Sequence, residues 1–284
     1  GEGLSTERAD LDFDGNDEIW VRSGAFSALL APARGGTLVD WTTFDPPHNW
    51  AAGLARRPEA YHGEVGEGHE AARGGIATIH DSESRRSGRT PYDAGMRALF
   101  VDRFPGPRAS LDSFQAGDLD DRGDFAGAAY AFETRSDGAS LSREGTVAGA
   151  RTRVEKVYRF APEGSVEVRW RVEGTEAFAT EATFFPAFLA LGGGGMRAEG
   201  REVPWQEARD LGTIARLEFV EGAVGARLVL EFGPAARVWT FPVQTLSRSE
   251  KDFERTTQGI ALLAAWSTRE GNRAALAVRV EKGS

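Results

Sequence analysis

Residues that could do acid–base chemistry are concentrated between Leu54 and His62. This stretch has the sequence Leu-Ala-Arg-Arg-Pro-Glu-Ala-Tyr-His, so it combines Arg56, Arg57 and Tyr61 with a proline, a glutamate and a histidine. The solvated face of a helix would spread its charges and would seldom add proline, tyrosine and histidine together. His62 and Glu59 could act as an acid and a base if a cleft brought the two side chains together.

Two further polar segments follow at a distance along the chain. The first is Thr78–Asp81, in which His80 and Asp81 form a second histidine–carboxylate pair. The second is Phe241–Glu250, which is followed by Gln258-Gly259. A histidine and a carboxylate beside arginines more often form a buried hydrogen-bond network than a catalytic pair. Both roles stay open at this point.

The chain has seven tryptophans, and some of them could be stacking platforms for sugars. Trp170 lies on the inward face of a predicted strand and is expected in the core. Trp41, Trp50 and Trp205 lie in or near predicted loops, so we expect them to be the exposed, sugar-stacking candidates. The alternative is that these three pack against a partner domain.

Acidic residues alternate near the N-terminus and end in a glycine turn, as in the first half of a calcium loop. Asp10, Asp12 and Asp14 would be the ligands, together with a later acid. An EF-hand is disfavoured because its twelfth position, counted from Asp10, is Val21 and not a bidentate glutamate. We therefore predict no cofactor apart from calcium, and the alternative is an acidic turn that leads into a strand.

Several other functions are disfavoured by composition. The net charge of −9 argues against nucleic acid as a partner. The chain has no run of 18 consecutive apolar residues, which is about the length that a membrane-spanning helix needs. The absence of cysteine suits a reducing compartment, and no leader peptide is visible, so we expect a cytoplasmic location. No paired-histidine zinc motif, phosphate loop or nucleophile elbow is found.

These segments must be positioned by a scaffold of strands. The clearest strand is Ser165–Glu173, in which four apolar residues alternate with four charged ones, as in a half-buried antiparallel strand. Turn signals recur about every ten residues, which favours a large β-sandwich. Further strands are expected at 18–21, 25–31, 37–43, 151–160, 179–191, 214–221, 226–232, 238–241, 260–266 and 274–280.

Helices are expected to be few. One short helix is predicted between Asn49 and Ala60, ending near Pro58. Residues 63–75 and 82–113 lack periodicity and are expected to be long loops. No second domain is evident, so residues 1–284 are predicted to form a single all-β domain with one or two short helices.

The polar segments together resemble one known family. The runs Arg56–His62, Ile79–Asp81, Arg108–Asp112, Phe241–Glu250 and Gln258-Gly259 are similar to the C-terminal β domain of glycoside hydrolase family 57 4-α-glucanotransferases and α-amylases. The resemblance covers nearly the whole chain in the family's order. The chain departs from the family's pattern at Ser113, where a histidine is usual, and at Thr257, where a tyrosine is expected.

The resemblance implies a galactose-mutarotase-like β-supersandwich. It also implies that the catalytic residues lie in an N-terminal (β/α)₇ barrel, which this chain lacks. The expected function is an accessory domain that packs on that barrel and lines its α-1,4-glucan cleft. The residues that would face the cleft or the barrel are Arg56, Arg57, Glu59, Tyr61, His62, His80 and Asp81.

Two other functions stay open. One is an autonomous mutarotase-like enzyme, which needs a glutamate base and a histidine acid facing an open pocket. The other is a plain carbohydrate-binding or scaffold module. The expected partners are the catalytic barrel and a maltooligosaccharide, with no nucleic acid and no membrane.

Overall fold

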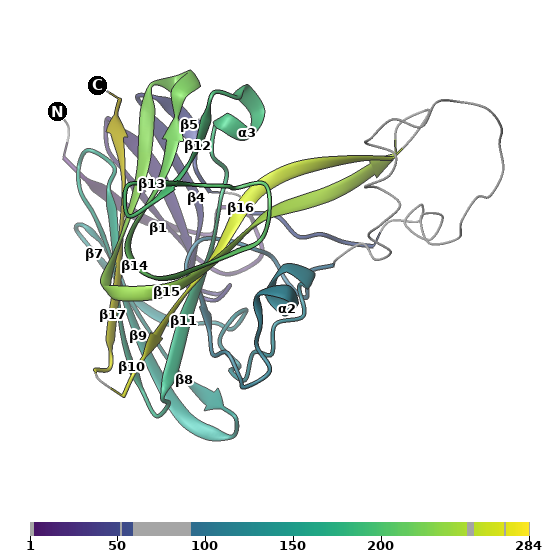
Figure 1. Cartoon of the computed structure of the whole chain (residues 1–284). Coiled ribbons are helices and arrows are strands. Elements are labelled where there is room, and N and C mark those ends of the chain that lie inside the picture. The colour runs from purple at the N-terminus through teal and green to yellow at the C-terminus, as the bar shows by residue number, and fades with distance from the viewer. Residues whose placement is uncertain (1–2, 52, 59–91, 249–252, 270, 284) are drawn as a thin grey trace.

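The computed structural model describes residues 3–51, 53–58, 92–248, 253–269 and 271–283. Within these residues the protein is built almost entirely from antiparallel strands, which confirms the predicted all-β class (Figure 1). The strands form two sheets, one of five strands and one of twelve.

The five-stranded sheet comprises the N-terminal strands in the order of the chain. Its strands are β1 (Ser5–Ala9), β2 (Glu18–Arg22), β3 (Phe26–Ala31), β4 (Thr37–Phe44) and β5 (Pro47–Asn49). The turn between β3 and β4 needs glycine at position 35. Gly35 has a φ of 76°, and a Cβ there would lie 2.3 Å from the Ala126 carbonyl oxygen.

The twelve-stranded sheet contains the remaining strands. Nine follow one path in the order β13-β12-β14-β15-β17-β10-β9-β8-β7, while β11 pairs with β16 and β6. The bounds are β6 (Val101–Arg103), β7 (Ala131–Arg135), β8 (Gly138–Val147), β9 (Ala150–Phe160), β10 (Val166–Glu173), β11 (Ala177–Phe184), β12 (Gly194–Ala198), β13 (Arg201–Val203), β14 (Arg209–Glu221), β15 (Ala226–Arg248), β16 (Phe253–Ser267) and β17 (Arg273–Lys282).

The main core lies between the two sheets. The alternation predicted for β10 is confirmed, since Val166, Val168, Trp170 and Val172 are all buried. Side chains of both sheets meet there, as in the stacked rings of Phe26 and Phe160, whose centroids are 5.6 Å apart. Burial of this large apolar surface is the main source of the domain's stability.

Strand β15 is long enough to take part in two regions of the sheet. Its first half pairs with β14 and β17, and its second half pairs with β16 as far as Arg248 and Phe253. This β15–β16 hairpin projects away from the body of the domain (Figure 1). The conspicuous segment Phe241–Arg248 therefore forms one arm of a projecting hairpin.

The helices differ from the prediction. None of the described residues between Asn49 and Pro58 is helical, because Ala51 and Leu54 pair instead with extended segments at Phe184 and Arg97. Helices are found at α2 (Leu111–Ala116) and α3 (Phe188–Leu191), and a 3₁₀ turn, η2, covers Gly222–Val224. No helix in the described part of the chain has the length and apolar character that crossing a bilayer requires.

Helix α2 begins where a long loop was predicted, and its start is set by a capping box. The Ser110 hydroxyl accepts the Ser113 amide hydrogen at 3.1 Å, and the Ser113 hydroxyl accepts that of Ser110 at 3.0 Å. Gly117, with a φ of 78°, ends the helix. Ser113, one of the two departures from the family pattern, thus has a structural role here.

A fully buried ion pair lies at the centre of the fold. Lys156 Nζ is 2.9 Å from the Asp102 carboxylate, and neither side chain is exposed. Lys156 also donates to the carbonyl of Phe100 at 2.8 Å, and Asp102 accepts from the Tyr130 hydroxyl at 2.6 Å and the Trp170 indole at 2.8 Å. Burial raises the pKa of Asp102 and lowers that of Lys156, while their mutual attraction opposes both shifts.

Replacing Lys156 with methionine should strongly destabilise the domain. The change leaves the Asp102 charge buried without its counter-charge, so we expect the free energy of unfolding to fall by about 3–5 kcal/mol. Urea unfolding at pH 7 measures this loss.

Lys282→Met is the matched control. Lys282 makes an exposed ion pair with Asp45 at 2.6 Å, and such surface pairs contribute about 0–1 kcal/mol. Equal stabilities for the two variants would contradict a central role for the buried pair.

Candidate functional site

Two segments that are distant in sequence lie side by side near the base of the projecting hairpin. Leu54 and Arg97 exchange backbone hydrogen bonds of 3.2 and 2.7 Å, and the Asp93 amide donates to the Arg56 carbonyl at 2.9 Å. The chain segments on either side of residues 59–91 are therefore held together by a short antiparallel pairing.

Arg56 is buried at this pairing and binds Asp93. Its Nη2 is 2.7 Å from Asp93 Oδ1, and its Nε and backbone N–H donate to Asp93 Oδ2 at 3.1 and 2.9 Å. Nη2 also donates to the Gln115 carbonyl in α2 at 2.9 Å. Arg56 thus joins the 54–56 segment to the 93–97 segment and to helix α2.

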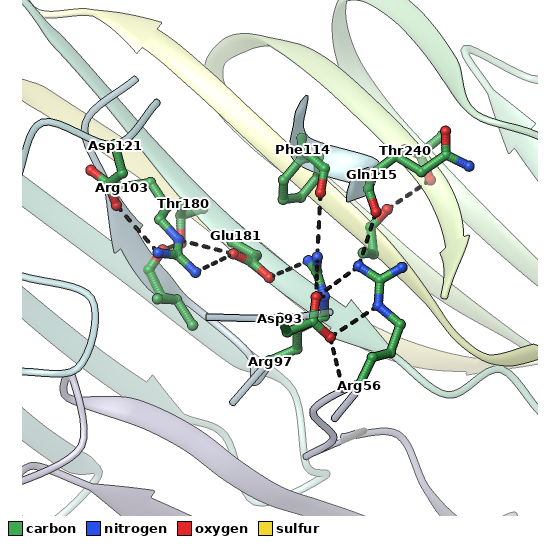
Figure 2. Close-up of polar contacts among 12 residues, drawn as sticks. Arg56, Asp93, Arg97, Arg103, Phe114, Gln115, Asp121, Thr180, Glu181 and Thr240 are labelled. Carbon is green, nitrogen blue, oxygen red and sulfur yellow. Dashed lines mark hydrogen bonds and ion pairs between the residues drawn. The ribbon is translucent and has the colours of Figure 1, made fainter. Parts of the chain in front are cut away.

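Arg97 extends this contact into a chain of alternating charges (Figure 2). Its guanidinium lies 2.8 Å from Asp93 and 2.7 Å from Glu181 on β11. Glu181 also accepts from Arg103 on β6 at 2.8 Å, and Arg103 reaches Asp121 at 3.2 Å. We call these residues the arginine network: Arg56, Asp93, Arg97, Glu181, Arg103 and Asp121.

Aromatic rings complete the packing around the network. Phe241 on β15 lies with its ring centroid 5.0 Å from the Arg97 guanidinium and 5.8 Å from that of Arg56. Phe114 of α2 meets the Phe241 ring edge-on, with centroids 5.0 Å apart. These two rings belong to a second apolar cluster, apart from the main core. The network therefore fixes the base of the β15–β16 hairpin.

The electrostatics of the network fit a positioning role. Burial alone would raise the pKa of Asp93, but hydrogen bonds from Arg56 and the charge of Arg97 outweigh it and hold the pKa below the usual range. Asp93 is therefore a stable anion whose oxygens are already bound by two arginines. A carboxylate held in this state is a poor proton donor, so Asp93 serves to hold the two arginines in place.

The structure describes two of the seven residues predicted to face the cleft or the barrel. Arg56 is only 5 % exposed, and its guanidinium is used within the domain, whereas its neighbour Arg57 is exposed. The other five lie outside the described residues, and their role stays a prediction; they are Glu59, Tyr61, His62, His80 and Asp81.

The expectation that Trp41 and Trp50 are exposed is wrong. Both side chains are completely buried. The Trp41 indole donates to the Gly164 carbonyl at 3.0 Å, and the Trp50 indole donates to the Thr43 hydroxyl at 2.9 Å. Because each indole N–H finds a partner inside the protein, both rings belong to the core, and neither can stack on a sugar.

Trp205 differs from these two because it is only partly buried. It lines a pocket of about 620 Å³ beside the β12–β13 hairpin, together with Arg197 and Glu202. Its ring packs against Phe188 of α3, with centroids 5.2 Å apart. Of the three predicted stacking candidates, Trp205 alone has the exposure that stacking requires.

A buried carboxylate lies beside this pocket. Glu221 on β14 pairs in register with Gly194, which lines the pocket. The Glu221 side chain is buried, with 1 % of the residue exposed. Its Oε2 accepts the Phe188 amide hydrogen at 2.8 Å. Burial raises the pKa of Glu221 to about 7, against the opposing effect of backbone hydrogen bonds from Phe188 and Ala187.

The acidic loop brings together two of the three named carboxylates and a later acid, but not Asp14. Oxygens of Asp10, Asp12 and Glu18 lie within 4.8 Å of one another, whereas Asp14 accepts the Asn16 amide hydrogen at 2.8 Å. Arg34 Nη2 lies 2.9 Å from Asp12 and 3.5 Å from Glu18. Arg34 already supplies positive charge to the oxygens of Asp12 and Glu18. Calcium at this loop stays a prediction.

The arginine network could be predicted from the sequence only in part. Arg56 belongs to a conspicuous polar segment, but Asp93, Arg97 and Arg103 lie in a region without periodicity. One signal was available at Glu181. It is the sole charge in the strand Ala177–Phe184, and a charge in such an apolar strand must be paired to be buried.

Comparison with known proteins places the chain in a family. The sequence profile described as "Alpha-amylase/4-alpha-glucanotransferase, C-terminal" matches residues 10–279. The chain belongs to this family. The 4-alpha-glucanotransferase of Thermococcus kodakarensis is 32 % identical over 261 residues, which cover 89 % of this chain and 37 % of that protein. The chain thus spans little more than a third of the length of this curated relative.

Two solved structures share the fold of this chain. The crystal structure of 4-alpha-glucanotransferase from Thermococcus litoralis matches with a TM-score of 0.76 and 24 % identity, over 99 % of this chain and 40 % of that one. A galactose mutarotase-like protein from Clostridium acetobutylicum matches with a TM-score of 0.54 and 10 % identity, over 99 % of each chain. At these identities the match shows the fold alone, and it confirms the predicted galactose-mutarotase-like fold.

Arg56 and Arg57 offer a test of the arginine network within one dipeptide. Arg56→Met removes the side-chain hydrogen bonds to Asp93 and Gln115, so we expect the free energy of unfolding to fall by about 2–3 kcal/mol. Arg57→Met changes an exposed residue and should alter it by less than about 0.5 kcal/mol. Urea unfolding of both variants decides the matter, and equal losses would argue against the network.

Glu221 should make stability depend on pH. Because its folded pKa of about 7 is above the usual 4.5, the folded state retains a proton that the unfolded state releases between these values. The free energy of unfolding therefore falls as pH rises through this window, by at most about 3 kcal/mol. Glu221→Gln keeps an acceptor for the Phe188 amide and should remove this contribution.

The measurement is urea unfolding of the parent chain and Glu221→Gln at pH 5 and pH 8. The variant should gain stability relative to the parent at pH 8. Glu202→Gln, at an exposed carboxylate, is the control. A pH-independent difference between the parent and Glu221→Gln would contradict the raised pKa.

Proposed function

We propose that this chain is an accessory β-sandwich domain of a 4-α-glucanotransferase or α-amylase, and that it packs against the catalytic barrel of the same protein. In this proposal the domain lines one wall of the cleft that holds an α-1,4-glucan. The protein acts in the cytoplasm, as expected from the absence of cysteine.

The observation that carries the proposal is the convergence of the family's segments at one place. Arg56, helix α2 with Gln115, and Phe241 on β15 come from three distant parts of the sequence and meet in the arginine network. Such a buried network is costly unless each charge is paired. A rigid base of this kind suits a hairpin that must hold a fixed position against another part of the protein.

The acidic loop supports an interface as well. Phe13 is 90 % exposed and has a φ of 60°, which is unusual for a large residue. Leu11 in the same loop is 42 % exposed. These two apolar side chains are available for contact with another part of the protein.

Within the described residues, no observation supports the alternative of an autonomous mutarotase-like enzyme. His48 is the histidine within the described residues, and its Nε2 lies 2.7 Å from the Phe185 carbonyl. Its ring packs between those of Trp50 and Phe185. Neither of the two pockets characterised among the described residues has a histidine in its lining.

The first test is to incubate this chain alone with maltoheptaose and to resolve the products by size. An accessory domain should leave the substrate unchanged, because the chemistry belongs to the catalytic barrel. A ladder of longer and shorter glucans would overturn the proposal and would mean that the sandwich has its own active site.

A second test uses the whole protein that carries this domain. His62→Ala and His80→Ala should each lower the rate of glucan transfer about tenfold or more, since both would position the substrate in the cleft. His69→Ala is the matched control, because His69 lies outside the segments that resemble the family. Unchanged transfer in the His62 and His80 variants would remove these residues from the proposed cleft.

A further inference from the structure

The pocket beside the β12–β13 hairpin has the size of a small-molecule site. Its volume of about 620 Å³ lies within the range of about 300–1,000 Å³ that is usual for ligand pockets. The β12–β13 hairpin is at one end of the strand order of the large sheet, so the pocket is formed by different elements from the arginine network.

Trp205 is the aromatic residue of the pocket lining. The residue is partly exposed, and its ring is held from one side by Phe188. Gln206 Oε1 accepts the Trp205 amide hydrogen at 3.1 Å, which places the Gln206 side chain beside the backbone of Trp205. A held tryptophan offers a large apolar surface at a low cost in conformational entropy.

The polar groups of the pocket favour a neutral ligand. Arg197 and Glu202 are the charged residues of the lining, and they lie opposite each other in the β12–β13 register. Their side chains approach to 3.5 Å and are 40 % and 85 % exposed, so they balance each other in charge and remain open to solvent. The pocket lining thus offers the guanidinium donors of Arg197, the carboxylate of Glu202 and the amide of Gln206 near Trp205. These groups match a ligand with many hydroxyl groups.

Two neighbouring glycines explain how the pocket stays open. A Cβ at Gly194 would lie 2.3 Å from the Val220 carbonyl oxygen, so glycine is required there by close packing. A Cβ at Gly195 would meet nothing within 4 Å, although Gly195 lines the pocket. A side chain at position 195 would therefore project into open space at the pocket without meeting another atom of the domain.

We propose that this pocket binds a maltooligosaccharide, with Trp205 stacking on a glucose ring and with Arg197, Glu202 and Gln206 contacting its hydroxyl groups. The identity of the sugar rests on the function proposed above, whereas the preference for a neutral polyhydroxyl ligand follows from the pocket itself.

The test is a calorimetric titration of the chain with maltoheptaose. Trp205→Ala and Gly195→Val should each weaken binding about tenfold or more. The first removes the stacking surface, and the second fills space in the pocket while Trp205 and Phe188 stay packed. Valine is well tolerated in strands, so Gly195→Val should fold.

Trp20→Ala is the matched control. Trp20 is also partly buried but lies on β2, where its indole donates to Ser27 at 2.8 Å, and its loss should leave the affinity within about twofold. Circular dichroism confirms the fold of each variant. Absence of maltoheptaose binding by the parent chain, or unchanged binding by a folded Gly195→Val, would overturn the proposed site.

The two proposals fail in different ways. If the chain neither converts nor binds maltoheptaose, the proposed accessory function stands and the proposed binding site is overturned. If the chain makes new glucans and Gly195→Val still loses maltoheptaose binding, the proposed binding site stands and the accessory function is overturned.

Discussion

The buried pair of Lys156 and Asp102 constrains how the two sheets meet. A charge in the core is tolerated only when its hydrogen-bonding groups are satisfied, and here the partners come from several elements. Lys156 on β9 donates to the carbonyls of Gly35 and Gly36 in the β3–β4 turn at 3.3 and 3.2 Å. Asp102 lies on β6 and receives its partners from β10 and from Tyr130. The five-stranded sheet therefore has one satisfactory position against the larger one.

The arginine network connects the buried pair to the β15–β16 hairpin. Arg103 on β6 is the neighbour of Asp102, so the same short strand contributes to the central pair and, through Glu181, to the network. From there Arg97 and Arg56 contact the ring of Phe241 at the start of the projecting arm of β15. The network therefore fixes where this arm leaves the body of the domain.

The strands were predictable because they depend on local patterns. The alternation in β10 and the turn signals between strands follow from the period of two in a half-buried strand, which is a property of consecutive residues. The helix predicted over residues 49–60 was wrong for the opposite reason. Leu54 is extended because Arg97, which is distant in sequence, offers it backbone hydrogen bonds. Propensity is a weak preference, and such tertiary pairing overrides it.

For the candidate site, the sequence alone determined the family resemblance, the all-β class and the importance of the Arg56 and Phe241 segments. Only the tertiary structure decided which side chains are free to act. In the folded protein Trp41, Trp50 and Arg56 are buried, and Arg56 is paired with Asp93. Arg57 is exposed, and Trp205 is partly exposed. The physical reason is that residue type and spacing define what a side chain can do, whereas burial and partners depend on segments that meet only when the sheets pack.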